Sequence, residues 1–455
     1  MIFINVNFTI MKYKEYQKRL ANFIELKKKC IIAVDMGLGK TLSTLAWMDW
    51  YCYRKSYKNV KGLIIAPKRV AENNWLQEMK KFSFLCLEDI SAIVKGTALK
   101  RKLILADENY PIKIIGRDNI ADIDTTVHYD FVVFDELTSY KNIKSKRYKV
   151  ANKIIADYKI GLTGTLLANG AIDIYAQAEV LGIHYPHRNF YSWRADFFRD
   201  IFKNAPVTFE KWELNVDLDI LLQPIKNNIF TLSAEDWLEI PEKTEHIIPV
   251  VLEKEIYKNI NELNSFLSTE INGEVVDIKE KAKFAKLQTM CNGFVYDEDG
   301  NAIRTEKSTK LNAVVNKACE IVEQNERVLI FYAYREEEAW LKEMLTEEGL
   351  KVINVKDDDD FMQKWNNAEI DVLLAHPASA GHGLNLQYGG RNIIWSTLTY
   401  NYEFFAQGNA RLARQGQTGN VQIYYFIASD TIEERVVSAL TKKSNEQQKF
   451  VELTK

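Results

Sequence analysis

The sequence has few cysteines and almost no net charge, and each shortage argues against a class of protein. Its five cysteines form no Cys-x-x-Cys pair and are odd in number, so neither a disulfide framework nor a zinc ribbon is expected. A reducing, intracellular compartment is therefore expected. The 60 basic and 62 acidic residues give a formal charge of -2, which argues against a protein that binds nucleic acid as a uniform polycation.

Long hydrophobic runs are also lacking. The opening run, residues 1–10, is short, is interrupted by Asn5 and Asn7, and has neither a basic leader nor a small-residue cleavage site. It is therefore predicted to be a strand and neither a signal peptide nor a membrane span. We expect no membrane partner and a cytoplasmic location.

The 455 residues do contain two series of short β-branched runs separated by helical stretches. This alternation is typical of parallel sheets covered by helices, so the predicted fold class is α/β with two lobes. The first series comprises 30–34, 62–66, 112–116, 131–135 and 158–163, and the second comprises 328–332, 371–375, 392–396 and 421–427.

Residues 172–310, between the two series, are aromatic-rich and show helical spacing of apolar positions, which predicts helical insertions on the lobes. Pro241 marks the predicted crossing between the lobes, because proline ends helices and is common in connections. The predicted domains are 1–245 and 246–455, and the second is expected to end in a helix.

A glycine turn, AVDMGLGKT, follows the first buried run and precedes a helical stretch. Strand, glycine turn and helix form the context that a phosphate-binding loop needs, although a valine stands where the usual pattern has its first glycine. Gly37 and Gly39 would let backbone amides approach phosphates. Lys40 would pair with the outer phosphate oxygens, and the Thr41 hydroxyl would hold Mg²⁺.

Two acids, Asp135 and Glu136, end the hydrophobic run FVVFD. Because α/β sheets bind ligands at the carboxyl ends of strands, Asp135 can reach Mg²⁺ and Glu136 can polarise an attacking water. Together with a phosphate loop about a hundred residues upstream, the pair predicts hydrolysis of a nucleoside triphosphate.

Two basic segments follow. On a helix, Gln407, Arg411 and Arg414 would share one face, and no Asp or Glu occurs within 404–420 to neutralise the two guanidinium groups. This pair is therefore predicted to face a phosphate. Residues 141–153 would place three lysines on one helical face, which fits a solvated face as well as a nucleic-acid contact. These three are Lys146, Lys149 and Lys153.

In this order, these elements resemble helicase superfamily two and, within it, the Swi/Snf-type DNA translocases, over about residues 12 to 440. The segments that carry the resemblance are YKEYQKRL, IIAPKRVAENNW, DELTSYKN, LTGTLLANG with its Asn169, LQTMCNGF, STKLNAVV, ERVLIFYAY, LLAHPASAGHGLNLQ and RQGQ. The last is characteristic of the Swi/Snf-type branch, and the match is closest to compact forms that bacteriophages often encode. Thr138 departs from the usual His of the DEAH box, and Tyr400-Asn401-Tyr402 replaces Trp-Asn-Pro.

The resemblance implies two tandem RecA-like lobes with ATP in the cleft between them, and ATP and Mg²⁺ as cofactors. The ATP site that it implies comprises Gln17 as the adenine reader, Met36, Gly37, Leu38, Gly39, Lys40, Thr41, Gly383, Arg411 and Arg414. Its catalytic residues are Lys40, Asp135, Glu136, Gln407, Arg411 and Arg414, and its Mg²⁺ ligands are Thr41 and Asp135. The implied nucleic-acid contacts are Lys68, Arg69, Lys141, Lys146, Lys149, Thr163, Thr165, Ser379, Asn385 and Tyr400.

The function implied is ATP-driven movement along double-stranded DNA by a monomer, through sequence-tolerant backbone contacts and with a recruiting protein left open. A phage-encoded protein would act in the host cytoplasm. One alternative is a strand-separating DNA or RNA helicase of the same superfamily, against which the lack of an obvious wedge domain weighs. The other is a non-hydrolysing nucleic-acid-binding scaffold, against which the intact Lys40, Asp135 and Glu136 weigh.

Overall fold

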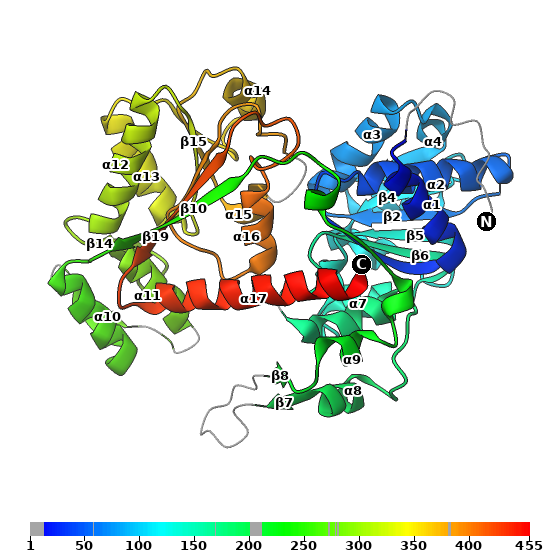
Figure 1. Cartoon of the computed structure of the whole chain (residues 1–455), viewed down its shortest axis with the longest axis horizontal. Helices are drawn as coiled ribbons and strands as arrows, with labels where there is room; N and C mark the ends of the chain where they lie inside the picture. Colours follow the sequence, from blue (N-terminus) through cyan, green and yellow to red (C-terminus); the bar gives the residue numbers. More distant parts are fainter. Residues whose placement is uncertain are drawn as a thin grey trace. The chain divides into compact units, whose positions relative to one another are not determined.

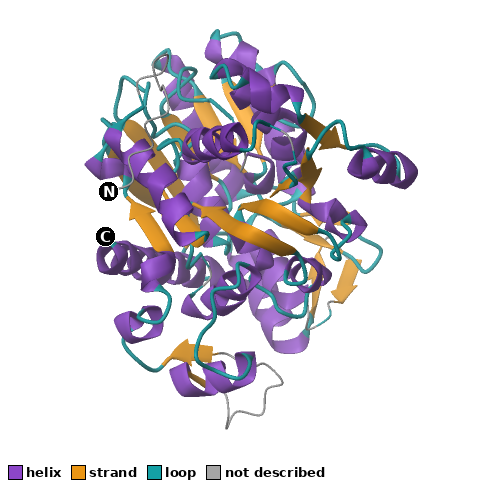
Figure 2. Cartoon of the chain, turned by 90° about the vertical axis from the view of Figure 1, so that its right-hand side faces the viewer, coloured by secondary structure: helices purple, strands orange, loops and turns teal. Residues whose placement is uncertain are grey.

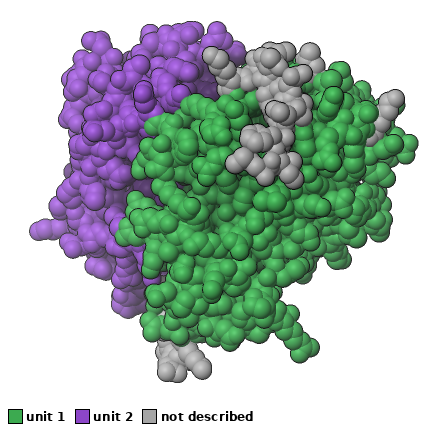
Figure 3. Space-filling view, turned by 45° about the vertical axis from the view of Figure 1, so that its right-hand side comes forward, with its two compact units in different colours: residues 1–238, 443–455 green, residues 239–442 purple. Residues whose placement is uncertain are grey.

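The structure is a computed structural model that describes residues 13–57, 59–168, 170–200, 212–271, 274–277, 279, 282–380 and 384–455. The predicted strand at 1–10 lies outside the described residues. Contacts divide the chain into two compact units, drawn in different colours in Figure 3. Unit 1 comprises Met1–Leu238 and Lys443–Lys455, and unit 2 comprises Glu239–Lys442.

Unit 1 is built on a seven-stranded sheet with the order β3-β4-β2-β5-β6-β1-β9, in which every neighbouring pair is parallel (Figure 1). The sequence patterns predict five of these strands and miss β3 and β9. Both are four-residue strands at the edges of the sheet, where the pattern is too short to stand out. The bounds are β1 Lys29–Val34, β2 Gly62–Ala66, β3 Ser91–Val94, β4 Ile112–Gly116, β5 His128–Asp135, β6 Ile155–Thr163 and β9 Ile229–Leu232.

Helices cover both faces of this sheet, because successive strand residues point to opposite sides (Figure 2). On one face, Trp47 of α2 packs against Phe131 of β5, with ring centroids 5.7 Å apart. On the other, Val132 belongs to a buried cluster with Ile174 and Ala178 of α7. The helices are α1 Glu15–Lys27, α2 Lys40–Arg54, α3 Trp75–Lys81, α4 Leu85–Asp89, α5 Ala98–Ala106, α6 Lys146–Ala151, α7 Ile174–Val180, α8 Phe190–Phe197 and α9 Leu218–Leu222, with short turns η1 Val70–Asn74, η2 Arg117–Asp122, η3 Leu137–Tyr140, η4 Ala171–Asp173, η5 Lys226–Asn228 and η6 Ala234–Asp236.

The insertion of unit 1 is less helical than its apolar spacing predicts. Helix α8 ends at Phe197, and the next residues form β7 (Phe198–Asp200), which pairs antiparallel with β8 (Trp212–Leu214). Phe198 is buried in the core cluster of unit 1. Burial of this ring in a strand thus replaces the helical continuation that its spacing predicts.

Unit 2 contains a six-stranded, all-parallel sheet with the order β10-β19-β18-β15-β17-β16. Pro241, the predicted crossing, lies close to the start of unit 2 at Glu239, and strand β10 follows it, pairing with β19 from Lys243 to Val250. Pro249 can sit in this strand because β10 is an edge, where one side of the backbone needs no partner. The bounds are β10 Lys243–Val250, β15 Val328–Phe331, β16 Val352–Asn354, β17 Val372–Ala375, β18 Asn392–Trp395 and β19 Val421–Ala428.

Helices and two small antiparallel hairpins complete unit 2. The hairpins pair β11 (Ser268–Ile271) with β12 (Glu274–Asp277), and β13 (Phe294–Tyr296) with β14 (Ala302–Arg304). The helices are α10 Lys254–Phe266, α11 Lys283–Cys291, α12 Thr309–Glu323, α13 Arg335–Glu347, α14 Phe361–Asn366, α15 Pro377–Ala380, α16 Tyr402–Asn409 and the first part of α17 Ile432–Thr454. Two parallel sheets with helices, one in each unit, confirm the predicted fold class.

Helix α17 begins in unit 2, and its last residues belong to unit 1. Phe450 is fully buried in the core cluster of unit 1, and the hydroxyl groups of Thr454 and Thr231 lie 2.8 Å apart. The predicted boundary at residue 245 therefore does not anticipate that 443–455 packs with the first unit. Among the described residues, no helix is both long and apolar enough to span a membrane.

Candidate nucleotide site and nucleic-acid interface

The predicted phosphate loop has the local structure that its sequence indicates. Strand β1 ends at Val34 and helix α2 begins at Lys40. Gly37 (φ 85°) and Gly39 (φ 73°) both adopt left-handed conformations, which a side chain would strain. The Lys40 ammonium donates to the Val34 carbonyl at 2.6 Å and to the Asp35 carbonyl at 3.3 Å. The lysine therefore lies folded across the turn.

Gln17 of α1 lies directly against this loop. A Cβ built on Gly39 would stand only 2.9 Å from the Gln17 side-chain nitrogen, so the Gln17 amide lies directly against the backbone of the loop. The Gln17 side-chain oxygen accepts a hydrogen bond from the Lys14 amide at 2.9 Å. The structure thus brings the predicted adenine reader and the phosphate loop together, and the reading of adenine stays a prediction.

Asp135 and Glu136 stand at the carboxyl end of β5. The Asp135 carboxylate accepts hydrogen bonds from the Trp75 indole and the Glu136 amide, both at 3.1 Å. Burial raises the pKa of Asp135, while the Trp75 hydrogen bond and the charge of Lys40 act to lower it. Glu136 has a left-handed φ of 55°, which is uncommon outside glycine.

The Thr-Gly-Thr segment completes this cluster from the end of β6. A Cβ on Gly164 would lie 3.7 Å from the Lys40 ammonium and 3.8 Å from the Met36 side chain. The Thr163 hydroxyl accepts a hydrogen bond from the Thr165 amide at 3.1 Å, and both threonines are buried. Their predicted contact with nucleic acid stays a prediction. Asn169 lies outside the described residues.

Two neighbours of Asp135 escape the sequence analysis. Trp75 reaches Asp135 from α3, and no local pattern marks this tryptophan as its partner. Arg117 follows strand β4 directly, donates to the Ser139 hydroxyl, and its charge lowers the pKa of Asp135. The strand-end rule that identifies Asp135 would also have identified Arg117.

In unit 2 the two predicted arginines converge, although not on a helix. Helix α16 ends at Asn409, where the Asn409 side chain bonds the Trp395 indole, so Arg411 and Arg414 lie in the turns that follow. The prediction that they share a helical face with Gln407 is therefore wrong. Both guanidinium groups nevertheless donate to the Leu384 carbonyl, at 3.3 and 3.2 Å.

The polar side chains around this carbonyl are largely buried. Gln407 and Arg411 are 3% and 4% exposed, and burial lowers the pKa of Arg414. The carbonyl that both arginines share belongs to the Gly-Leu-Asn segment, which the sequence analysis assigns to the same site. Gly383 of that segment lies outside the described residues.

The predicted nucleic-acid contacts differ in exposure. Lys68 and Arg69, which precede η1, are exposed, as are Lys146 and Lys149 on α6. Lys141 is partly buried and lies 3.9 Å from a carboxylate oxygen of Asp173. In unit 2, Asn385 and Tyr400 are exposed and Ser379 in α15 is partly buried.

One expectation about the basic segment is wrong. Helix α6 covers only Lys146–Ala151, because Asn152 and Lys153 form a turn after it. Lys153 therefore does not share a helical face with Lys146 and Lys149. Within the described ranges, no group of three or more His, Cys, Asp or Glu side chains could hold a metal ion by itself.

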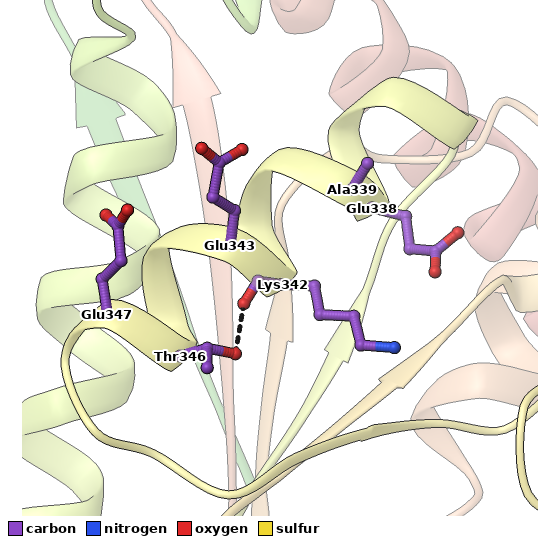
Figure 4. A pocket seen from close by; sticks show the side chains of 6 residues that line it. All are labelled: Glu338, Ala339, Lys342, Glu343, Thr346 and Glu347. Carbon is purple, nitrogen blue, oxygen red and sulfur yellow. Dashed lines mark hydrogen bonds between the residues drawn. The ribbon is translucent and has the colours of Figure 1, made fainter.

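A surface hollow on α13 contains none of the predicted site residues (Figure 4). Its six lining residues all come from this one helix, and three of them are glutamates. The one hydrogen bond drawn there joins the Thr346 hydroxyl to the Lys342 carbonyl and only closes a helical turn. The hollow therefore belongs to the solvated face of α13.

Comparison with known proteins defines the class. The helicase domain of Pyrococcus furiosus Hef superposes with a TM-score of 0.51 at 14% identity, covering 94% of this chain and 98% of that domain, so the fold is that of a helicase core. The model of the SNF2-related domain matches residues 16–293. The chain therefore belongs to the SNF2-related family.

Two relatives show how far the similarity extends. Protein p41 of Acyrthosiphon pisum secondary endosymbiont phage 1 is 27% identical, covering 97% of this chain and 98% of its own length. An uncharacterized ATP-dependent helicase of Mycoplasma pneumoniae is 26% identical over 95% of this chain, which spans only 42% of that protein. The predicted family, its ATP-dependent enzyme class and the likeness to a phage protein are confirmed.

Proposed function

We propose that the chain binds ATP at the glycine turn of unit 1 and hydrolyses it to move along double-stranded DNA. One observation supports this proposal most. Lys40, Gly164 and Asp135, from three separate segments, meet at the carboxyl ends of adjacent parallel strands. Parallel sheets bind phosphate ligands at this edge. None of the three segments is near another in sequence, so their meeting is a property of the fold.

The donor set of unit 1 fits a triphosphate with Mg²⁺. The Gly37–Gly39 turn leads into the start of α2, where backbone amides would bind phosphate oxygens, and Lys40 would supply a positive charge. The Thr41 hydroxyl and the Asp135 carboxylate are oxygen donors, which Mg²⁺ prefers. When bound, Mg²⁺ would neutralise phosphate charge. Glu136 would accept a proton from the attacking water.

The arginines of unit 2 would supply the remaining charge. The guanidinium groups of Arg411 and Arg414 both donate to the Leu384 carbonyl, so they lie close enough to act as a pair. We propose that they reach the γ-phosphate when the two lobes close on ATP. The weak carbonyl contact would then be exchanged for charged phosphate oxygens, which bind guanidinium groups more strongly.

Double-stranded DNA is the proposed track because the RQGQ segment resembles that of the Swi/Snf-type branch. The exposed Lys68, Arg69, Lys146 and Lys149 of unit 1 suit phosphate contacts, which carry no sequence information. A strand-separating helicase would use the same ATP site, so the nucleic acid that stimulates hydrolysis distinguishes the two functions.

Steady-state ATP hydrolysis, measured with duplex DNA, single-stranded DNA or RNA added separately, tests this proposal. We expect duplex DNA to give the largest stimulation. Stronger stimulation by RNA or by single strands would favour the helicase alternative.

Two variants test the chemistry of the site in the same assay. Lys40→Ala should abolish turnover, because the transferred phosphoryl group loses a fixed charge. Glu136→Gln should slow hydrolysis while retaining ATP, because only the base changes. A folded Lys40→Ala protein with normal turnover would contradict the phosphate-loop assignment.

A further inference from the structure

Unit 2 displays two aromatic rings that touch each other at its surface. Phe284 of α11 is 40% exposed, and Tyr400, in the loop between β18 and α16, is 49% exposed. Their ring centroids lie 5.8 Å apart at an interplanar angle of 76°, an edge-to-face contact. Leaving a large part of both rings in water is unfavourable. Neither ring belongs to the buried clusters of unit 2.

Buried hydrogen bonds hold the elements that carry these two rings in place. Residues 284, 288 and 292 follow one another at four-residue intervals, so they line one side of α11 and its end. The Gln288 amide donates to the Leu398 carbonyl at 3.0 Å and accepts from the Tyr334 hydroxyl at 2.8 Å. Gln288 is only 4% exposed. The helix that carries Phe284 is thus bonded to the loop that carries Tyr400.

A second set of buried hydrogen bonds fixes the same loop. The Asn292 amide donates to the Thr397 hydroxyl, which donates in turn to the Glu337 carboxylate, each at 2.8 Å. Glu337 is fully buried and also accepts from the Ala333 amide at 2.9 Å. Buried, hydrogen-bonded contacts of this kind restrict side chains and backbone to one arrangement. The exposed rings therefore stand on a rigid support.

The charges around Phe284 favour an anionic partner. On α11, Lys283 donates to the Asn264 carbonyl at 2.7 Å, and Lys286 donates to the Tyr296 carbonyl. Main-chain carbonyls do not cancel the positive charge of Lys283, whereas Lys286 is also close enough to Asp297 for that carboxylate to act on its pKa. Duplex DNA combines an anionic backbone with apolar sugar faces and base edges, and two exposed rings with lysines beside one of them match that chemistry.

We infer that Phe284 contacts nucleic acid and that, with Tyr400, it forms a two-ring surface against the sugars and base edges of one DNA strand. The inference rests on the proposed function, which supplies DNA as the ligand. It adds Phe284 to a set of predicted contacts in which Tyr400 is the one aromatic ring.

An apolar contact has a signature that a phosphate contact lacks. Each phosphate contact releases counterions, so its loss makes the dependence of log affinity on log salt shallower by about one unit. Loss of a ring contact releases no counterion and leaves that slope unchanged. Affinity measured at several salt concentrations therefore separates the two kinds of contact.

The test compares duplex DNA affinity and DNA-stimulated hydrolysis of the full chain and its variants. Phe284→Ala should weaken duplex affinity about tenfold with an unchanged salt slope, because one base or sugar contact is lost. Hydrolysis without DNA should be unaffected. Phe284→Tyr should retain affinity, and Phe284→Leu, which keeps much of the apolar surface, should lose less affinity than Phe284→Ala.

Two controls calibrate this result. Phe266→Ala removes a more exposed phenylalanine, 77% exposed on α10, and should change neither affinity nor slope. The double reversal Lys146→Glu and Lys149→Glu should make the slope shallower. An unchanged affinity of Phe284→Ala, or a shallower slope for it, would overturn the inference. Failure of duplex DNA to stimulate the wild-type chain would instead count against the proposed function.

Discussion

At the scale of single residues, burial lowers the pKa of one lysine that is not part of the candidate nucleotide site. Lys159 of β6 is 7% exposed, pairs across the sheet with Lys29 of β1, and donates to the Val180 carbonyl at 3.1 Å. Burial, together with the charge of Lys29, lowers the pKa of Lys159 to about 8. The folded chain therefore holds this proton less tightly than the unfolded chain.

The sign of the pH effect follows from these values. Below about pH 8 both states carry the proton, and above the ordinary pKa of 10.5 neither does. Between them the unfolded chain binds more protons, so the free energy of unfolding rises with pH. Lys159→Met removes the titrating group. We expect the stability of the wild type relative to this variant to rise by about 3 kcal/mol across that window.

Denaturant unfolding at a series of pH values measures this difference. The exposed Lys153→Met is the matched control and should follow the wild type at each pH. If the free energies of unfolding of the wild type and of Lys159→Met differ by the same amount at every pH in this window, the lowered pKa is contradicted.

Single residues also show what the sequence can predict about the site. Lys40 is identified because it follows a glycine turn between an apolar strand and a helix, and Asp135 because it ends an apolar strand. Trp75 is not, because its bond to Asp135 depends on the packing of α3 beside β5 and spans 60 residues. Local patterns thus identify the groups that act on a ligand and miss the groups that hold them.

At the scale of elements, the end of α17 acts as a part of unit 1. Gln447 accepts a hydrogen bond from the Leu167 amide at 3.1 Å, in the loop after the Thr-Gly-Thr segment. Phe450 fills the core of unit 1, and Lys455 pairs with Asp236 at 2.6 Å. This helix therefore supports both the hydrophobic core and a loop of the candidate site.

Phe450→Ala tests the support from this helix. A fully buried phenylalanine leaves a cavity when truncated, which costs about 3 to 5 kcal/mol. We expect a loss of this size in the free energy of unfolding of unit 1, measured by denaturant unfolding of the full chain. Gln448→Ala changes an exposed neighbour on the same helix and should have little effect. Equal stability of the two variants would mean that the helix end is not packed in the core.

Elements also mark where periodicity fails as a guide. The central strands, such as β2 and β17, are buried along their length and stand out as apolar runs. The edge strand β10 is mostly exposed and contains a proline, so it has the pattern of a connection. Its identity comes from pairing with β19, which no local pattern reveals.

At the scale of the whole molecule, the proposed ATP site draws on residues from both units. Unit 1 holds the glycine turn, Lys40, Asp135 and Glu136, and unit 2 holds Arg411 and Arg414. If the arginines act only when the lobes close on ATP, unit 1 binds the nucleotide and unit 2 controls its turnover. An isolated first lobe is a poor test, because it would lack the 443–455 segment that packs with unit 1.

A single substitution in the full chain avoids this difficulty. An arginine that stabilises the charge of the transferred phosphoryl group is worth roughly 10³ to 10⁵ in rate. Arg414→Ala should therefore lose most DNA-stimulated hydrolysis, while the affinity for a fluorescent ATP analogue falls far less. Arg391→Ala is the control, because Arg391 pairs with Glu326 at 2.7 Å on the surface of unit 2. It should keep both turnover and nucleotide affinity.

Turnover and nucleotide affinity, measured together, distinguish a role of Arg414 in catalysis from a role in ATP binding. Parallel losses of turnover and affinity in Arg414→Ala would make the arginine a binding group and not a catalytic one. Full turnover in Arg414→Ala would show that unit 1 hydrolyses ATP without help, and lobe closure would then have no chemical role. Lost turnover with retained affinity is the result that a two-lobe motor requires, because a motor must hold ATP before it commits to a step.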